Sequence, residues 1–177
     1  MPSSKHPICQ TVELLVAFVD LTNFARVSHN KTCTEVFDLC AGFFEGLGKI
    51  ITEAGGTVVK PIGDAALITF PKNKVDAGVL ALLQSKLEVD QMMQAADLPC
   101  RLIVKAHFGE VATGTIVAGS SKWHEVYGET VNIAATLESK GFAISPQLFR
   151  CLGTESRRLF KKHTPPMTYI PLSERHT

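Results

Sequence analysis

The sequence predicts an α+β sandwich in which helices pack on a mostly antiparallel sheet. A nearly continuous apolar run, Val12–Asp20, has the pattern of a central strand that is covered on both faces. Two β-prone runs, Thr57–Ile62 and Ala65–Phe70, flank Gly63-Asp64, and a Gly at the first central position suits a tight hairpin turn. The order strand, helix, hairpin, helix, strand is typical of an α+β fold with helices on one face of the sheet.

The first part of the chain contains clear helix signals between the strand and the hairpin. Residues 1–11 are expected to form a flexible N-terminal arm, and residues 21–24 a turn after the first strand. Thr32–Glu35 has the spacing of a capping box, and apolar residues then recur at helical spacing through Val36–Ala54. Gly55 is expected to end this helix in a left-handed conformation.

The second part of the chain alternates helical and extended patterns, with Gly and Pro as boundary signals. A helix capped by Asn73 and reaching Met92 is expected first, followed by strands 101–108 and 111–117, separated at Gly109, and a strand 123–127. A helix Val131–Lys140, ended by Gly141, and a short strand at Ile144 come next. The last expected elements are a helix from Ser145-Pro146 to Gly153 and a strand 167–171.

Length and composition favour one globular domain. The chain has 177 residues, of which 45% are apolar and 20% charged, and its net charge of +1 gives no indication of a nucleic-acid partner. Its 5 cysteines are widely spaced, which favours reduced thiols over disulfides or a zinc site. No apolar run is long enough to insert into a membrane, so we expect a cytoplasmic domain over residues 12–171 and a tail over 172–177.

Two acidic residues at strand ends are candidates for metal binding. Asp20 ends the first strand and Asp64 lies at the tip of the hairpin that could pair beside it. Two carboxylates on neighbouring strand ends offer the oxygen ligands that magnesium prefers and leave positions open for phosphates and water. Each has an ordinary alternative role, Asp64 as a turn residue and Asp20 as a cap of the following segment.

Three blocks of sequence, in the same order and with consistent spacing, resemble class III nucleotide cyclases, the adenylate and guanylate cyclase catalytic domains. The blocks are Phe18–Phe24, Gly55–Asp64 and Tyr127–Ala135, and the resemblance covers about residues 12–170. It implies a ferredoxin-like sandwich and a head-to-tail homodimer, with active sites at the subunit interface that are each built from both chains.

The resemblance also implies roles for individual residues. Asp20 and Asp64 would bind two Mg²⁺ or Mn²⁺ ions per site, one promoting attack of the ribose 3′-hydroxyl and the other holding the triphosphate. Backbone amides around Asn23 and Phe24 would bind phosphates. From the partner chain, Lys60 and Glu125 would contact the purine and Asn132 would orient the ribose. Lys161 (or Lys162) would contact the terminal phosphate.

One departure from the family pattern concerns catalysis. The helix that carries Asn132 usually has an Arg one turn further on, which stabilises charge on the phosphates, and this chain has Thr136. Losing one such donor typically lowers the rate by about a hundred- to a thousand-fold, or about 3–4 kcal/mol. Lys140, expected another turn along the same face, could replace the Arg only in part, because an ammonium lacks the guanidinium fork.

A second departure concerns the base. Adenylate cyclases pair a Lys with an Asp at the purine positions, and guanylate cyclases use a Glu and a Cys, so Lys60 with Glu125 is closer to the adenine pair and favours ATP over GTP. Simpler roles remain open: Lys60 as a solvated strand residue, Glu125 as an ion-pair partner of Lys122 or His124, and Asn132 as a helix cap.

Three functions follow from these residues. The first is metal-dependent conversion of ATP to 3′,5′-cyclic AMP and pyrophosphate, weakened by Thr136. The alternative is a catalytically impaired cyclase-like module that binds nucleotide or dimerises, which Thr136 favours and the retained carboxylates disfavour. Phosphatase-like transfer through Asp20 is disfavoured, because that chemistry usually requires a second acid where Thr22 stands.

Overall fold

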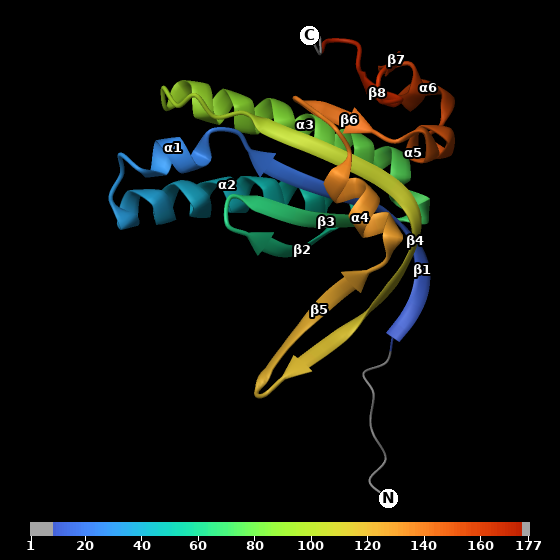
Figure 1. The fold of residues 1–177 in the computed structure, drawn as a ribbon, viewed down its shortest axis with the longest axis horizontal. Helices are drawn as coiled ribbons and strands as arrows, with labels where there is room; N and C mark the ends of the chain where they lie inside the picture. Colours follow the sequence, from blue (N-terminus) through green and yellow to red (C-terminus); the bar gives the residue numbers. More distant parts are fainter. Residues whose placement is uncertain (1–8, 175–177) are drawn as a thin grey trace, which may run out of the picture.

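A single sheet of eight strands forms the centre of the computed structural model, which describes residues 9–174 (Figure 1). The strand order is β2-β3-β1-β4-β6-β8-β7, with β5 paired to β4 outside this path. All pairs are antiparallel except β4 with β6. The strands are β1 Cys9–Leu21, β2 Thr57–Ile62, β3 Ala65–Pro71, β4 Leu102–Ala118, β5 Ser121–Tyr127, β6 Phe142–Ile144, β7 Phe160–His163 and β8 Thr168–Pro171.

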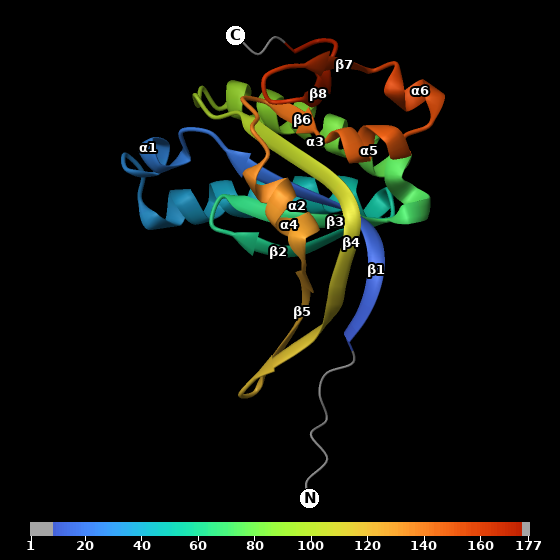
Figure 2. The same cartoon turned by 45° about the vertical axis from the view of Figure 1, so that its right-hand side comes forward.

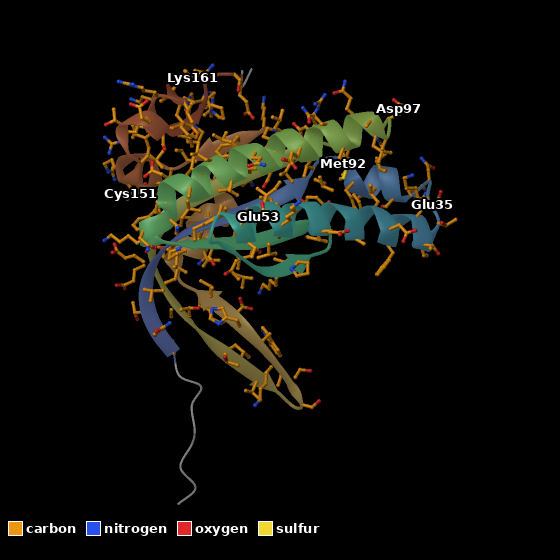
Figure 3. The ribbon with its side chains drawn as sticks, turned by 180° about the vertical axis from the view of Figure 1, so that it is seen from behind. Glu35, Glu53, Met92, Asp97, Cys151 and Lys161 are labelled. Atoms are coloured by element: carbon orange, nitrogen blue, oxygen red, sulfur yellow. The ribbon has the colours of Figure 1, made fainter. Side chains whose placement is uncertain are left out.

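Helices cover both faces of this sheet. The two long helices, α2 and α3, lie on one face and bury the main core with α5, as the view from behind shows (Figure 3). The short α4 packs on the opposite face over a smaller apolar cluster that includes Val16, Val111 and Ala134. The helices are α1 Phe24–Ser28, α2 Cys33–Glu53, the 3₁₀ turn η1 Lys72–Lys74, α3 Val75–Ala95, α4 Glu129–Thr136, α5 Pro146–Cys151 and α6 Thr154–Arg157.

The predicted α+β sandwich is confirmed, but the expectation of helices on one face only is wrong, because α4 packs against β1 and β4 over a second apolar cluster. The local signals are confirmed. Thr32 and Glu35 form a complete capping box at the start of α2, in which the Glu35 backbone N–H donates to the Thr32 hydroxyl at 3.3 Å. Gly55 follows α2 with φ of +82°, which is the left-handed conformation expected there. Gly63, with φ of +64°, forms the tight turn between β2 and β3.

Two expected boundaries are wrong. Asn73 does not cap α3: it lies inside η1, and α3 begins at Val75 without a side-chain cap. Gly109 does not separate two strands, because β4 runs unbroken through it. A Cβ atom at Gly109 would lie 2.5 Å from the Thr130 hydroxyl oxygen, so the glycine permits α4 to approach β4 closely. That hydroxyl donates to the carbonyl of Glu110 at 2.7 Å.

The helix expected over Val131–Lys140 is also too long. It begins at Glu129 and ends at Thr136, and Leu137 is extended. The chain must turn there to reach β6, which pairs in parallel with β4, and the Val104 N–H donates to the Gly141 carbonyl at 2.7 Å. Tertiary pairing therefore overrides the helical pattern of the sequence at residues 137–140.

A long hairpin extends from the body of the domain. The outer part of β4 and all of β5 form this hairpin, which projects away from the helices in both views (Figures 1 and 2). Gly119, with φ of +60°, lies in its turn. Val117 and Trp123 on this hairpin are 53% and 41% exposed, so it carries large apolar side chains on its surface.

The two chain ends differ from the predicted arm and tail where they are described. Residues 9–11 of the predicted arm belong to β1, and residues 1–8 and 175–177 lie outside the described range. In the predicted tail, Leu172 is hydrogen-bonded to the domain: its N–H donates to the Leu159 carbonyl at 2.9 Å. The Glu174 carboxylate accepts from the Phe142 N–H at 2.8 Å and lies 3.7 Å from the Lys86 ammonium.

Glu174→Ala is expected to destabilise the domain by about 1–3 kcal/mol, because it leaves the buried Phe142 N–H without its acceptor. The free energy of unfolding from urea titration would measure this change. Glu155→Ala is the matched control: its carboxylate is 82% exposed and its ion pair with Arg158 should contribute little. Equal stability of the two variants would contradict the structural role of Glu174.

Candidate active site

Asp20 and Asp64 come together at one end of the sheet. The antiparallel register of β1 and β3 places Asp20 opposite Ala65, the residue that follows Asp64 in the hairpin. Both carboxylates line one cavity of about 230 Å³, together with Phe18, Ile62 and Ala135 among others. The hairpin turn and the end of the central strand thus form a shared acidic site from residues far apart in sequence.

The electrostatics of this pair favour a bound cation. Partial burial and then the negative charge of Asp64 raise the pKa of Asp20, while a hydrogen bond from the Leu21 backbone and the charge of Lys105 act in the opposite direction. Two carboxylates that destabilise each other's charge gain from a positive ion between them. Among residues 9–174 no cluster of three or more His, Cys, Asp or Glu side chains could hold a metal, so further ligands would be of another kind, such as backbone carbonyls, water or substrate.

The donor set fits Mg²⁺ or Mn²⁺. Carboxylate oxygens are the hard ligands that both ions prefer, and the described residues that line the cavity include no Cys, Met or His. Two protein ligands leave coordination positions for phosphate oxygens. The geometry is thus compatible with the two-ion site that the sequence predicts.

Asn23 and Phe24 follow β1 after Thr22, three and four residues beyond Asp20. Asn23 caps the N-terminus of α1 with φ of +58°, a left-handed conformation that Gly and Asn adopt more readily than other residues. The Asn23 side-chain amide donates to the Pro99 carbonyl at 3.0 Å and fixes the turn.

Lys60 and Glu125 form an ion pair between β2 and β5. The Lys60 ammonium lies 2.6 Å from Glu125 Oε2, and the Glu125 side chain is only 4% exposed. Burial alone would raise the pKa of Glu125, but hydrogen bonds from Lys60 and from the Val126 N–H outweigh it and lower the pKa. The partner of Glu125 is thus Lys60, whereas the ring of His124 bonds to the hydroxyl of Thr113 at 2.7 Å.

Asn132 and Thr136 lie one turn apart on α4, and both are exposed. The Thr136 hydroxyl donates to the Asn132 backbone carbonyl at 2.8 Å, so it closes the last turn of the helix. Because α4 ends there, Lys140 is not on a continuation of the same helical face. Thr136 and Lys140 nevertheless line a common cavity of about 540 Å³ beside the acidic site.

Lys161 lies on β7 and its ammonium donates to the Leu172 carbonyl at 3.1 Å. It does not line the cavity that contains Thr136, whereas His163, further along the same strand, does. The structure therefore does not bring Lys161 together with the other predicted residues in a single chain. Its contact with a terminal phosphate stays a prediction.

The prediction from sequence missed Lys105. This residue lies on β4 opposite Phe18 of β1, and its ammonium donates to the Ala135 carbonyl at 3.3 Å. A charged residue between the buried Val104 and Ala106 was visible in the strand pattern. Its position beside Asp20 depends on the register of β1 with β4, which the pattern does not specify.

Comparisons with known proteins agree with this geometry. Residues 8–163 match the model of the adenylate and guanylate cyclase catalytic domain. An adenylate cyclase from Anabaena cylindrica is 29% identical over 136 residues, which cover 72% of this chain and 27% of that protein. A receptor-type guanylate cyclase from Caenorhabditis elegans is 26% identical over 131 residues, 70% of this chain and 12% of that protein.

A solved structure shows the same fold over nearly the whole chain. The adenylyl cyclase CyaB from P. aeruginosa superposes with a TM-score of 0.82 at 18% identity, covering 95% of this chain and 97% of that one. The curated relatives are much longer than the part this chain matches. No helix within residues 9–174 has the length and apolar character needed to cross a bilayer. The chain belongs to the adenylate and guanylate cyclase catalytic domain family.

Proposed function

We propose that this chain is a metal-dependent nucleotide cyclase domain that converts ATP to 3′,5′-cyclic AMP and pyrophosphate at a homodimer interface, with low turnover. The observation that carries the proposal is the convergence of Asp20 and Asp64 on one cavity. A domain that only dimerises has no need of two carboxylates in one cavity, where the charge of Asp64 helps to raise the pKa of Asp20.

In this mechanism, Asp20 and Asp64 hold Mg²⁺ or Mn²⁺, which would lower the pKa of the ribose 3′-hydroxyl and neutralise charge on the triphosphate. Amides around Asn23 and Phe24 orient the phosphates for in-line displacement. The 3′-oxygen forms a bond to the α-phosphorus, its proton leaves to solvent, and the bond to the β-phosphate oxygen breaks to release pyrophosphate. Asn132 on α4 of the second copy of the chain orients the ribose.

The proposed dimer is supported by apolar surface on the same part of the domain. Large apolar side chains are exposed on the two hairpins: Ile62, Val117, Trp123 and Tyr127. A second copy of the chain would cover them and bring its own Lys60, Glu125 and Asn132 to the carboxylates, as the family resemblance implies. Where such side chains gather into one patch, the patch marks a protein interface.

ATP is the proposed substrate because of the Lys60–Glu125 pair. Lys60 can donate to a ring nitrogen of adenine, and the Glu125 carboxylate can accept from the exocyclic amine. The Lys60 ammonium and Glu125 Oε2 already lie 2.6 Å apart, on β2 and β5, where they could contact one base. The other candidate, an impaired module that binds nucleotide without turnover, is favoured only by Thr136.

The double variant Lys60→Glu with Glu125→Cys replaces the purine pair by the guanylate-type residues. It is expected to raise the ratio of kcat/KM for GTP to kcat/KM for ATP by at least about tenfold. One hydrogen bond lost or gained in a buried site changes the discrimination between two substrates by about 1.4 kcal/mol or more. Steady-state kinetics with both nucleotides would measure the ratio. Lys122→Gln, at an exposed position of β5, changes the net charge by the same amount and is the charge-matched control. Equal losses with ATP and GTP would contradict the assignment of the pair to the base.

The direct test is an assay of the purified protein with ATP or GTP and with Mg²⁺ or Mn²⁺, scored for 3′,5′-cyclic product. Sedimentation of the same samples would report whether the protein is dimeric. Product from ATP supports the proposal. No product from any nucleotide and metal pair in dimeric samples would overturn it in favour of the impaired module.

A further inference from the structure

Lys105 lines two neighbouring cavities, one that contains two carboxylates and one that contains a second lysine. It lines the cavity of about 230 Å³ that holds Asp20 and Asp64. It also lines the cavity of about 540 Å³ that holds Thr136 and Lys140. The two cavities meet at the C-terminal end of α4, since Ala135 lines the first and Thr136 the second.

The charges are arranged for a metal–polyphosphate complex. The smaller cavity contains two carboxylates, and the larger one adds Lys140 and His163, with Glu138 as its acidic residue. Lys105 is the only cationic side chain among the described residues that line the carboxylate cavity. A nucleotide whose ions sit at the carboxylates would therefore have Lys105 as its nearest positively charged neighbour on the same chain.

The structure holds Lys105 in this place from two sides. Its backbone is paired with Phe18 of β1 and with Ala143 of β6, so the strand position is fixed by neighbours on both edges. Its ammonium donates to the Ala135 carbonyl at 3.3 Å, at the last turn of α4, where unsatisfied carbonyls attract cations. The side chain thus lies across the gap between the acidic site and Thr136.

We infer that Lys105 contacts the polyphosphate of the nucleotide and supplies part of the positive charge that Thr136 does not provide. The inference rests on the proposed cyclase function and identifies a substrate-binding residue within it. Divalent ions at Asp20 and Asp64 repel the ammonium, and the phosphates of the same complex attract it. Lys140 is a weaker candidate, because it lines only the larger cavity.

The test compares Lys105→Met, which keeps the length and removes the charge, with Lys105→Arg, which keeps the charge. Calorimetry with inorganic pyrophosphate and Mn²⁺ is expected to show about tenfold weaker pyrophosphate binding for Lys105→Met and near-native binding for Lys105→Arg. Binding of Mn²⁺ alone is expected to stay equal or become tighter in Lys105→Met, because a like charge has been removed. Lys49→Met, at an exposed position of α2, should change neither value.

Two results would overturn the inference. Unchanged pyrophosphate binding in Lys105→Met would show that the ammonium does not touch phosphate. A parallel loss of Mn²⁺ binding and thermal stability would show a structural role instead. Pyrophosphate binding is measured without turnover, so a protein that forms no cyclic product would refute the proposed function and still give a result for Lys105.

A double-mutant cycle adds a kinetic test if the protein turns over. If Lys105 acts on the same charge as position 136, Thr136→Arg should raise kcat at least about threefold more in the Lys105→Met background than in the native chain. Equal gains in the two backgrounds would overturn the claim that the two positions act on a common charge.

Discussion

Asp20→Asn and Asp64→Asn are each expected to lower cyclic nucleotide formation by about a thousandfold or more, because loss of metal-based stabilisation costs several kcal/mol and each 1.36 kcal/mol is a factor of ten. Asparagine has the same shape as aspartate, so the change removes charge and leaves the local packing nearly intact. The rate with ATP and Mn²⁺, together with calorimetric Mn²⁺ binding, would measure the effect.

Asp20→Asn should not lose stability, and this separates a metal site from a structural role. The pKa of Asp20 is raised in the folded protein, first by partial burial and then by Asp64. A carboxyl group whose pKa is higher in the folded than in the unfolded protein lowers the free energy of unfolding at any pH above the unfolded pKa. Near neutral pH, replacing such a carboxylate by a neutral amide should therefore leave the stability unchanged or increase it. Thermal denaturation at pH 7 without metal would test this sign.

Asp38→Asn is the matched control for both measurements, because Asp38 is exposed on α2 and lines neither of the two cavities. It should leave the rate, the Mn²⁺ affinity and the melting temperature unchanged. Native rates in Asp20→Asn or Asp64→Asn would contradict the two-carboxylate site, and a large drop in melting temperature would indicate that the carboxylates are structural.

The elements that depend on local chemistry could be predicted from the sequence. The capping box at Thr32, the left-handed Gly55 and the turn at Gly63 each act within a few residues, so their signals are complete in the chain itself. Gly109 and the end of α4 depend on contacts between distant segments. Thr130, on α4, lies close to Gly109 of β4. The chain leaves the helix after Thr136 because β6 pairs with β4.

The candidate site divides in the same way. The pairing of Asp20 and Asp64 could be predicted because a hairpin beside a central strand brings its tip to that strand's end. Lys105 and His163 could not, since their places depend on the register of β4 with β1 and on the pairing of β7 with β8. Lys105 in particular looked like the solvated position of an alternating strand.

Thr136→Arg is expected to raise turnover by about a hundred- to a thousand-fold if the missing donor limits the rate, because one preorganised donor to developing charge is worth about that factor. The structure leaves room for the longer side chain, since Thr136 is exposed and lines the cavity of about 540 Å³. The hydrogen bond that is lost, from the Thr136 hydroxyl to the Asn132 carbonyl, closes an exposed turn, so the fold should tolerate the change.

Two further variants separate the charge of the new side chain from its shape. Thr136→Lys supplies the charge without the planar fork, and Thr136→Gln supplies a neutral amide donor. A gain that follows Arg > Lys > Gln in kcat, with similar KM for ATP, is the result expected of a group that acts mainly in the transition state. Unchanged kcat in Thr136→Arg would mean that the rate is limited elsewhere, by dimer assembly or by the position of Asn132, and that the departure at residue 136 is not the cause of low activity.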